Sequence, residues 1–181
     1  MKFDETFTHH GHKFGVKYEH DDDSGPPWEE FDCHGIVSDW TSRAKAPGER
    51  VLVKDYSRAR YYDVRASMQK ALEEGWSAST VLPTDTHRQK AQKAVQADFE
   101  YLHGWATDQW TYRHVVVCWI DLDGKPTAHR ASLGGVEDQD PAYLRTVALE
   151  LAENLIHDLP TWLDQQVQHA EHRRTAVQAR A

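Results

Sequence analysis

The sequence contains few cysteines and no long apolar run. Its two cysteines, Cys33 and Cys118, cannot build a disulfide framework, and Cys118 lies in the apolar stretch 115–120, where a buried free thiol is the ordinary state. Nowhere do about 18 apolar residues follow one another, and the first residues lack the basic and apolar regions of a signal peptide. We therefore expect a cytoplasmic protein without a membrane span.

The motifs of common enzymes are also missing. The sequence has no GxGxxG, no P-loop and no GxSxG, and Cys33 and His34 are adjacent with no third group to orient them. Its 12 histidines include no HxxxH pair, and His9 and His10 fall in a predicted turn, where alternation would point neighbouring side chains apart. The acidic residues 21–23 lack the glycine and distal glutamate of a calcium loop. We expect no catalytic residue, no metal site and no cofactor.

Basic residues are fewer than acidic ones. The net charge is −8 and the isoelectric point about 5.8, which disfavours a nucleic-acid binder with a general basic face. The 29 acidic residues are interspersed with 21 basic ones, which also disfavours an acidic mimic of DNA. Arg173, Arg174 and Arg180 could contact phosphates, but basic residues near the end of a polar helix are favourable to the helix dipole alone. A nucleic-acid partner stays open but is not favoured.

What is present is the composition of a globular protein. Of 181 residues, 39% are hydrophobic, and seven Trp, seven Tyr and five Phe supply bulky core material. The length suits one domain, and neither an internal repeat nor a second core is visible. We expect a single compact α+β domain over residues 1–163 and a polar helical tail over 164–181, where the apolar positions thin out.

The strands are predicted from alternation and turn residues. Residues 3–18 alternate around Gly11 and indicate a hairpin, and residues 51–53 indicate a third strand after an ordered loop that runs to about Arg50. Residues 112–122 and 127–133 flank an Asp-Gly turn and predict a second hairpin, which we place at the sheet centre.

The helices are predicted from apolar spacing and end signals. Asp63 is the expected N-cap of a helix that ends at Gly75, and a second helix is expected over 86–105. A long helix begins at Pro141, and Pro160 should kink or restart it. The expected fold is an antiparallel sheet of about five strands with helices packed on one face and a helical C-terminus.

Residues 21–40 form an unusually composed segment, with two tryptophans among many acidic and turn residues. Such a loop can present aromatic anchors ringed by polar groups to a partner, or Trp28 and Trp40 can simply cap the sheet. The candidate binding residues of this loop are Asp22, Trp28, Glu29, His34, Asp39, Trp40 and Arg43.

A resemblance is clearest in the same loop. It is carried by residues 25–30 (GPPWEE), 32–40 (DCHGIVSDW), 45–52 (KAPGERVL), 61–63, 74–76 and 94–110. These segments resemble a group of small uncharacterised proteins encoded by tailed phages and prophages, over about the first two thirds of the chain. Members of that group tend to have Gly at the position of Cys33, which speaks against a catalytic thiol. The resemblance implies a phage setting and no particular activity.

The leading functional hypothesis is a phage or prophage accessory protein, not an enzyme, that binds a host or phage macromolecule in the host cytoplasm. A protein partner is expected, in host takeover or in evasion of a defence system. The alternative is a small enzyme or nucleic-acid-processing protein whose carboxylates and histidines converge only in the fold.

Overall fold

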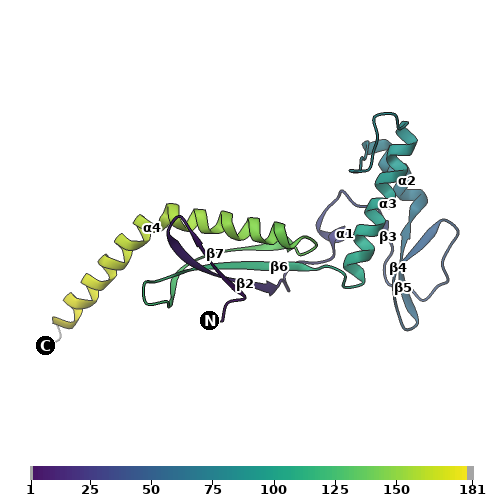
Figure 1. The fold of residues 1–181 in the computed structure, drawn as a ribbon. Coiled ribbons are helices and arrows are strands. Elements are labelled where there is room, and N and C mark those ends of the chain that lie inside the picture. Colours follow the sequence, from purple (N-terminus) through teal and green to yellow (C-terminus); the bar gives the residue numbers. More distant parts are fainter. Residues whose placement is uncertain (1, 179–181) are drawn as a thin grey trace. The chain divides into compact units, whose positions relative to one another are not determined.

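The structure is a computed structural model that describes residues 2–178, with side chains of the last helix described as far as Arg173. In chain order its elements are β1 (Glu5–His9), β2 (His12–His20), α1 (Pro27–Glu30), β3 (Ile36–Val37), β4 (Glu49–Asp55), β5 (Arg58–Asp63), α2 (Val64–Glu74), α3 (His87–Ala106), β6 (Tyr112–Ile120), β7 (Pro126–Glu137) and α4 (Pro141–Gln178) (Figure 1). The α+β class is confirmed. The expected single sheet of about five strands is wrong, because the strands form one antiparallel sheet of four and another of three.

The chain contains two compact units, where the sequence indicated one domain over residues 1–163. Unit 1 comprises Met1–Asp21 and Tyr112–Ala181, and unit 2 comprises Asp22–Thr111. Each unit has its own cluster of buried apolar side chains, so the expectation of only one core is wrong. Unit 2 is continuous in sequence, whereas unit 1 is assembled from the two ends of the chain.

The sheet of unit 1 has the strand order β1-β2-β6-β7. Both predicted hairpins are confirmed: His10 and Gly11 take positive φ angles of 46° and 80° in the first turn, and Gly124 takes 79° in the second. β6 pairs with β2 and β7 and is buried at most positions, as expected for a central strand. β7 lies at the sheet edge, so the central placement of the second hairpin is right only for β6.

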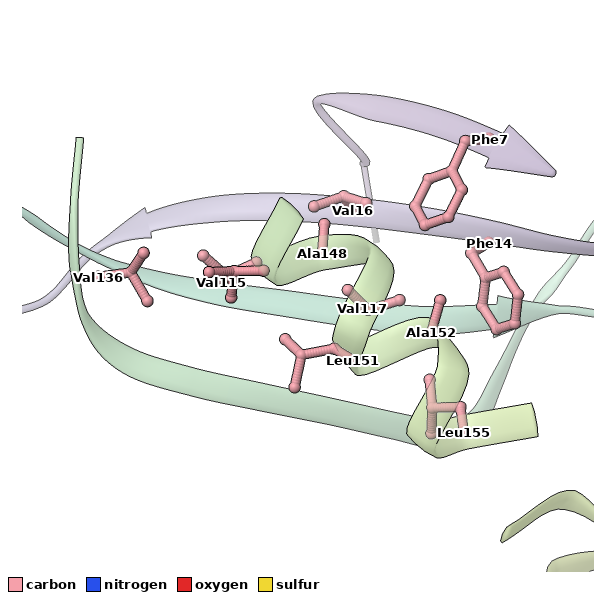
Figure 2. Packing of buried hydrophobic residues seen from close by; sticks show 11 residues of the cluster. Phe7, Phe14, Val16, Val115, Val117, Val136, Ala148, Leu151, Ala152 and Leu155 are labelled. Atoms are coloured by element: carbon pink, nitrogen blue, oxygen red, sulfur yellow. The ribbon is translucent and has the colours of Figure 1, made fainter. Parts of the chain in front are cut away.

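Helix α4 covers one face of this sheet. Leu151 and Leu155 of α4 belong to one cluster of buried apolar side chains with Val115 and Val117 of β6 (Figure 2). α4 continues as one helix through Pro160, so of the two predicted effects of this proline, a kink or a restart, the restart is wrong. Figure 1 shows that α4 changes direction along its length.

Unit 2 has a sheet in the order β3-β5-β4 against which α2 and α3 pack. α2 begins and ends as predicted, and α3 (His87–Ala106) is shifted by one residue from the predicted 86–105. The Asp63 side chain accepts the Ala66 N–H at the start of α2, Gly75 closes α2 in the left-handed conformation with φ 71°, and Thr86 and Gln89 form a capping box at α3. The core between sheet and helices contains Leu52, Tyr62, Ala71, Ala91, Val95, Phe99 and Leu102.

No helix within residues 2–178 is long and apolar enough to cross a membrane.

Candidate functional site

The loop after Asp21 is attached to strand β5 along much of its length. Ile36 and Val37 pair with β5 as β3, Ser38 donates its backbone N–H to the Tyr61 carbonyl at 2.8 Å, and Thr41 forms an isolated bridge with Ala59. The segment that was expected to be an ordered loop contains the short elements α1 and β3. This pairing places Trp40 beside the side chains of β5.

His34 is one of the predicted binding residues, and the structure places it in an anchor. Its Nδ1 lies 2.7 Å from Oδ1 of Asp98 on α3, and the other Asp98 oxygen accepts the Gly35 N–H and the Tyr62 hydroxyl, each at 2.8 Å. A Cβ atom on Gly35 would lie 2.3 Å from the Tyr62 oxygen, so only glycine fits there. Burial, and then the charge of Asp98, raise the pKa of Tyr62 above its ordinary value. Asp98 therefore holds the loop to α3.

Two further contacts hold the His34 ring and backbone. The imidazole stacks on the Tyr101 ring at 5.4 Å and 12°, and Lys70 donates to the His34 carbonyl at 2.9 Å. Only 11% of the His34 side chain is exposed. These contacts assign His34 a positional role in the loop.

Trp28 and Trp40 converge on a cluster of aromatic rings and guanidinium groups. The Arg60 guanidinium lies 5.6 Å from the Trp28 ring centre and 5.8 Å from the Trp40 ring centre, and Arg58 lies 5.6 Å from Trp40. Trp105 of α3 meets Trp28 edge to face at 5.3 Å and 89°. We call these five residues the tryptophan–arginine cluster. Its geometry is that of cation–π pairs, in which a flat cation faces an aromatic ring.

A small hollow of about 220 Å³ opens at this cluster. Its lining residues are Pro26, Trp28, Trp40, Val53, Arg60, Trp105 and Ala106. Trp40 is 37% exposed, whereas Trp28 is half-buried and its Nε1 has no hydrogen-bond partner among the described residues. Arg60 also pairs with Glu29 at 3.4 Å and donates to the Ser38 carbonyl at 3.4 Å. The hollow thus offers apolar walls, one cation and one exposed indole.

The structure brings together only part of the predicted site. Trp28, Glu29 and Trp40 meet at the cluster, but Asp22, Asp39 and Arg43 do not line its hollow. Asp22 and Asp39 are exposed.

Arg43 is engaged with a different carboxylate. Its guanidinium donates to Glu49 at 2.7 Å and 2.5 Å and lies 4.8 Å from the Tyr61 ring centre. The Arg43 bonds, together with the Ala46 N–H, lower the pKa of Glu49 to about 2. Arg43 therefore closes the turn before β4.

The sequence reasoning missed Arg58, Arg60, Trp105 and Asp98. Arg58 and Arg60 belong to β5, which was not predicted, although Arg58-Ala59-Arg60 alternates exposed and buried positions as a strand does. Trp105 lay within a correctly predicted helix. No local signal marks Asp98, because its partners come from residues 34–35 and from β5.

Unit 2 contains further hollows, and two of them bear on the candidate site. One of about 510 Å³ is lined by Cys33, His34, Trp76, Ser77, Ala97, Asp98 and Tyr101. Another, of about 770 Å³, lies beside α3 around Arg50 and Arg88 and contains none of the predicted residues. Only the first combines an exposed thiol, Cys33, with an oriented imidazole.

Comparison with known protein families, with curated proteins and with solved structures found no match. The C-terminal arginine cluster of the sequence falls partly outside the described residues, since Arg180 and the Arg174 side chain lie beyond them.

Proposed function

We propose that this protein is a non-enzymatic binding protein that attaches to another protein through the tryptophan–arginine cluster of unit 2. The observation that carries the proposal is an exposed indole, Trp40, flanked by Arg58 and Arg60 at a hollow large enough for one side chain. Tryptophan and arginine are the residue types most enriched among interface residues that dominate binding energy. The anchor at Asp98 supports this role, because a loop already held in place loses less entropy on binding.

Electrostatics favours a protein over a nucleic acid at this surface. The Glu29 carboxylate lies 3.4 Å from Arg60, so a phosphate approaching Arg60 would meet a negative charge already in place. The net charge of −8 adds a general repulsion of polyanions. An uncharged side chain of a partner protein, whether apolar, aromatic or polar, meets neither the repulsion by Glu29 nor the repulsion by the net negative charge.

The phage resemblance of residues 25–30 and 32–40 supports the setting of the proposal. These residues include Trp28 and Trp40 of the tryptophan–arginine cluster, and Glu29, which pairs with Arg60. The segments that carry the resemblance therefore contribute to the proposed binding surface. We place the protein in the cytoplasm of an infected or lysogenic host. A partner from host metabolism or from a defence system fits that setting.

The test begins with affinity capture from host cells that carry the phage or prophage. Wild type, Trp40→Ala and Leu122→Ala are compared; Leu122 is a fully exposed residue of unit 1. The expected partner is retained by wild type and Leu122→Ala and lost by Trp40→Ala at unchanged melting temperature. With the purified partner, Trp40→Ala should weaken binding by about 2 kcal/mol or more, close to thirtyfold in Kd. Equal binding of all three proteins would reject the cluster as the interface.

A second candidate is a small enzyme centred on His34. Its supporting observation is the Asp98 contact to Nδ1, which leaves Nε2 for proton transfer beside the hollow that contains Cys33. An enzyme would lose turnover in His34→Gln and Cys33→Ser while partner binding through Trp40 stays intact. Loss of binding in Trp40→Ala, with no turnover in any variant, supports the binding protein instead.

A further inference from the structure

Three potential metal ligands meet at the tip of the first hairpin of unit 1. His9 Nε2 lies 2.9 Å from Oε2 of Glu153 on α4, and His10 Nε2 lies 3.4 Å from the same oxygen. The three donor atoms all lie within 4.8 Å of one another. Glu153 is 144 residues from His9 in sequence, so no spacing motif could reveal the group.

The turn geometry explains why two adjacent histidines face the same carboxylate. In a regular strand, neighbouring side chains point to opposite faces, which is why a metal site was not expected here. His10 instead has φ 46°, in the left-handed region, and the following Gly11 has φ 80°. This turn brings the two imidazole rings to a centroid distance of 4.3 Å at 62°. The alternation of side chains that a regular strand would have does not hold at His10, so it does not exclude His9 and His10 as a pair of ligands.

We propose that His9, His10 and Glu153 bind a divalent transition metal ion of the Zn²⁺ class. Imidazole nitrogen at about 2.0–2.1 Å and carboxylate oxygen at about 2.0–2.2 Å are ordinary zinc bonds, which place tetrahedral ligand atoms about 3.3 Å apart. The two nitrogen-to-oxygen distances, 2.9 Å and 3.4 Å, lie close to that value before any adjustment. The two nitrogens lie within 4.8 Å of each other.

The exposure of the group defines what kind of metal site it is. The side chains of His9, His10 and Glu153 are 26%, 64% and 59% exposed, so water completes the coordination and the ion exchanges with solvent. Two imidazoles and a single carboxylate suit zinc, cobalt or nickel, whereas magnesium and calcium prefer oxygen ligands alone. The bound ion would link the β1–β2 turn to α4 within unit 1.

The experiment uses the full chain without a histidine tag, treated with chelator and then dialysed. Zinc chloride is titrated by calorimetry, and cobalt binding is followed by its visible absorption. We expect one saturable zinc site per chain, a zinc-induced rise in melting temperature, and no heat with magnesium. His10→Ala and Glu153→Gln should each weaken zinc binding at least about tenfold, since loss of an outer-shell partner alone costs 10–100-fold.

His157→Ala is the matched control, because His157 is an 88% exposed histidine of the same helix and is not a member of the group formed by His9, His10 and Glu153. It should bind zinc as wild type does and show the same rise in melting temperature. The proposal is overturned if zinc does not bind saturably. It is equally overturned if His10→Ala and Glu153→Gln keep wild-type affinity, since the ion is then held elsewhere, for example by His169 and His172.

Discussion

The Nδ1 atom of His34 lies 2.7 Å from the Oδ1 atom of Asp98, and this contact ties a loop with a partner-binding role in our proposal to the longest helix of unit 2. The sequence analysis assigned both His34 and Trp40 to partner binding, but the structure gives the two residues different surroundings. His34 holds the loop in place, whereas in our proposal the exposed Trp40 provides the contact surface for the partner. Stability and binding should therefore respond to different substitutions in the same loop.

Asp98→Asn tests the anchor. An asparagine keeps the shape but replaces one oxygen with an N–H donor, so it cannot accept from His34, Gly35 and Tyr62 together. We expect the free energy of unfolding to fall by about 1–3 kcal/mol, measured by urea denaturation. Glu100→Gln, on the exposed face of the same helix, should change it by less than about 0.5 kcal/mol. An unchanged Asp98→Asn protein would show that the anchor contributes nothing.

Trp28→Ala and Trp40→Ala should differ in stability. Trp28 is half-buried against Trp105, so its truncation should cost about 2–4 kcal/mol, whereas the exposed Trp40 should cost less than about 1 kcal/mol. Thermal and urea unfolding of both variants measure the difference. Equal large losses would mean that both rings only close the core, and the binding role of Trp40 would fail with them.

Leu151→Ala tests the packing of α4 on the sheet of unit 1. Leu151 is buried in the cluster with Val115 and Val117, so its truncation should cost about 2–5 kcal/mol through lost burial and a residual cavity. Leu163→Ala, on the same helix but 44% exposed, is the control and should cost less than about 1 kcal/mol. A loss below about 0.5 kcal/mol for Leu151→Ala would place α4 off the sheet.

Acid should release the Arg43–Glu49 pair only at very low pH. The pKa of Glu49 is lowered to about 2 from the ordinary 4.5, so the pair's contribution is fully present above about 4.5 and is lost as pH falls through about 2. Carboxyl titration by NMR measures this pKa directly. In Arg43→Ala it should rise toward 4.5, whereas in Arg58→Ala it should stay low. A wild-type value near 4.5 would contradict the pairing.

Truncation after Leu163 should leave both units folded. Residues 164–173 of α4 are all exposed, so their removal exposes no core side chain. The measurement is circular dichroism and melting temperature of the shortened chain beside the full one. Insolubility of the shortened protein would mean that this part of α4 packs against another molecule.

The parts of the fold that could be predicted from the sequence are those determined by near neighbours. Asp63 and Gly75 bound α2, and Gly11 and Gly124 turn the two hairpins, because capping and turn geometry involve only a few residues. β5 escaped prediction since its exposed side chains are arginines rather than recognisable strand formers. The division into two sheets depends on pairings between distant segments, which periodicity does not report.

The candidate site likewise depends on contacts between segments that are distant in sequence. Trp28 and Trp40 were found from composition, because two indoles in a polar loop are unusual. Arg60 and Trp105 joined them only through strand pairing and helix packing. His9 and His10 were set aside on the assumption of alternation, which the left-handed His10 breaks.

The interrupted course of unit 1 has a consequence for the order of folding. Its central strands β2 and β6 pair His20 with Arg113, and Asp21 donates its N–H to the Tyr112 carbonyl at 3.1 Å, so the excursion through residues 22–111 leaves and returns at adjacent backbone positions. An unfolded excursion of that length opposes this pairing by loop-closure entropy, which a folded unit 2 reduces by shortening the loop. Unit 2, which is one continuous segment of the chain, should therefore form first and bring β2 and β6 together for pairing. By the same geometry, a two-residue turn in place of residues 22–111 would join β2 to β6 as an ordinary hairpin.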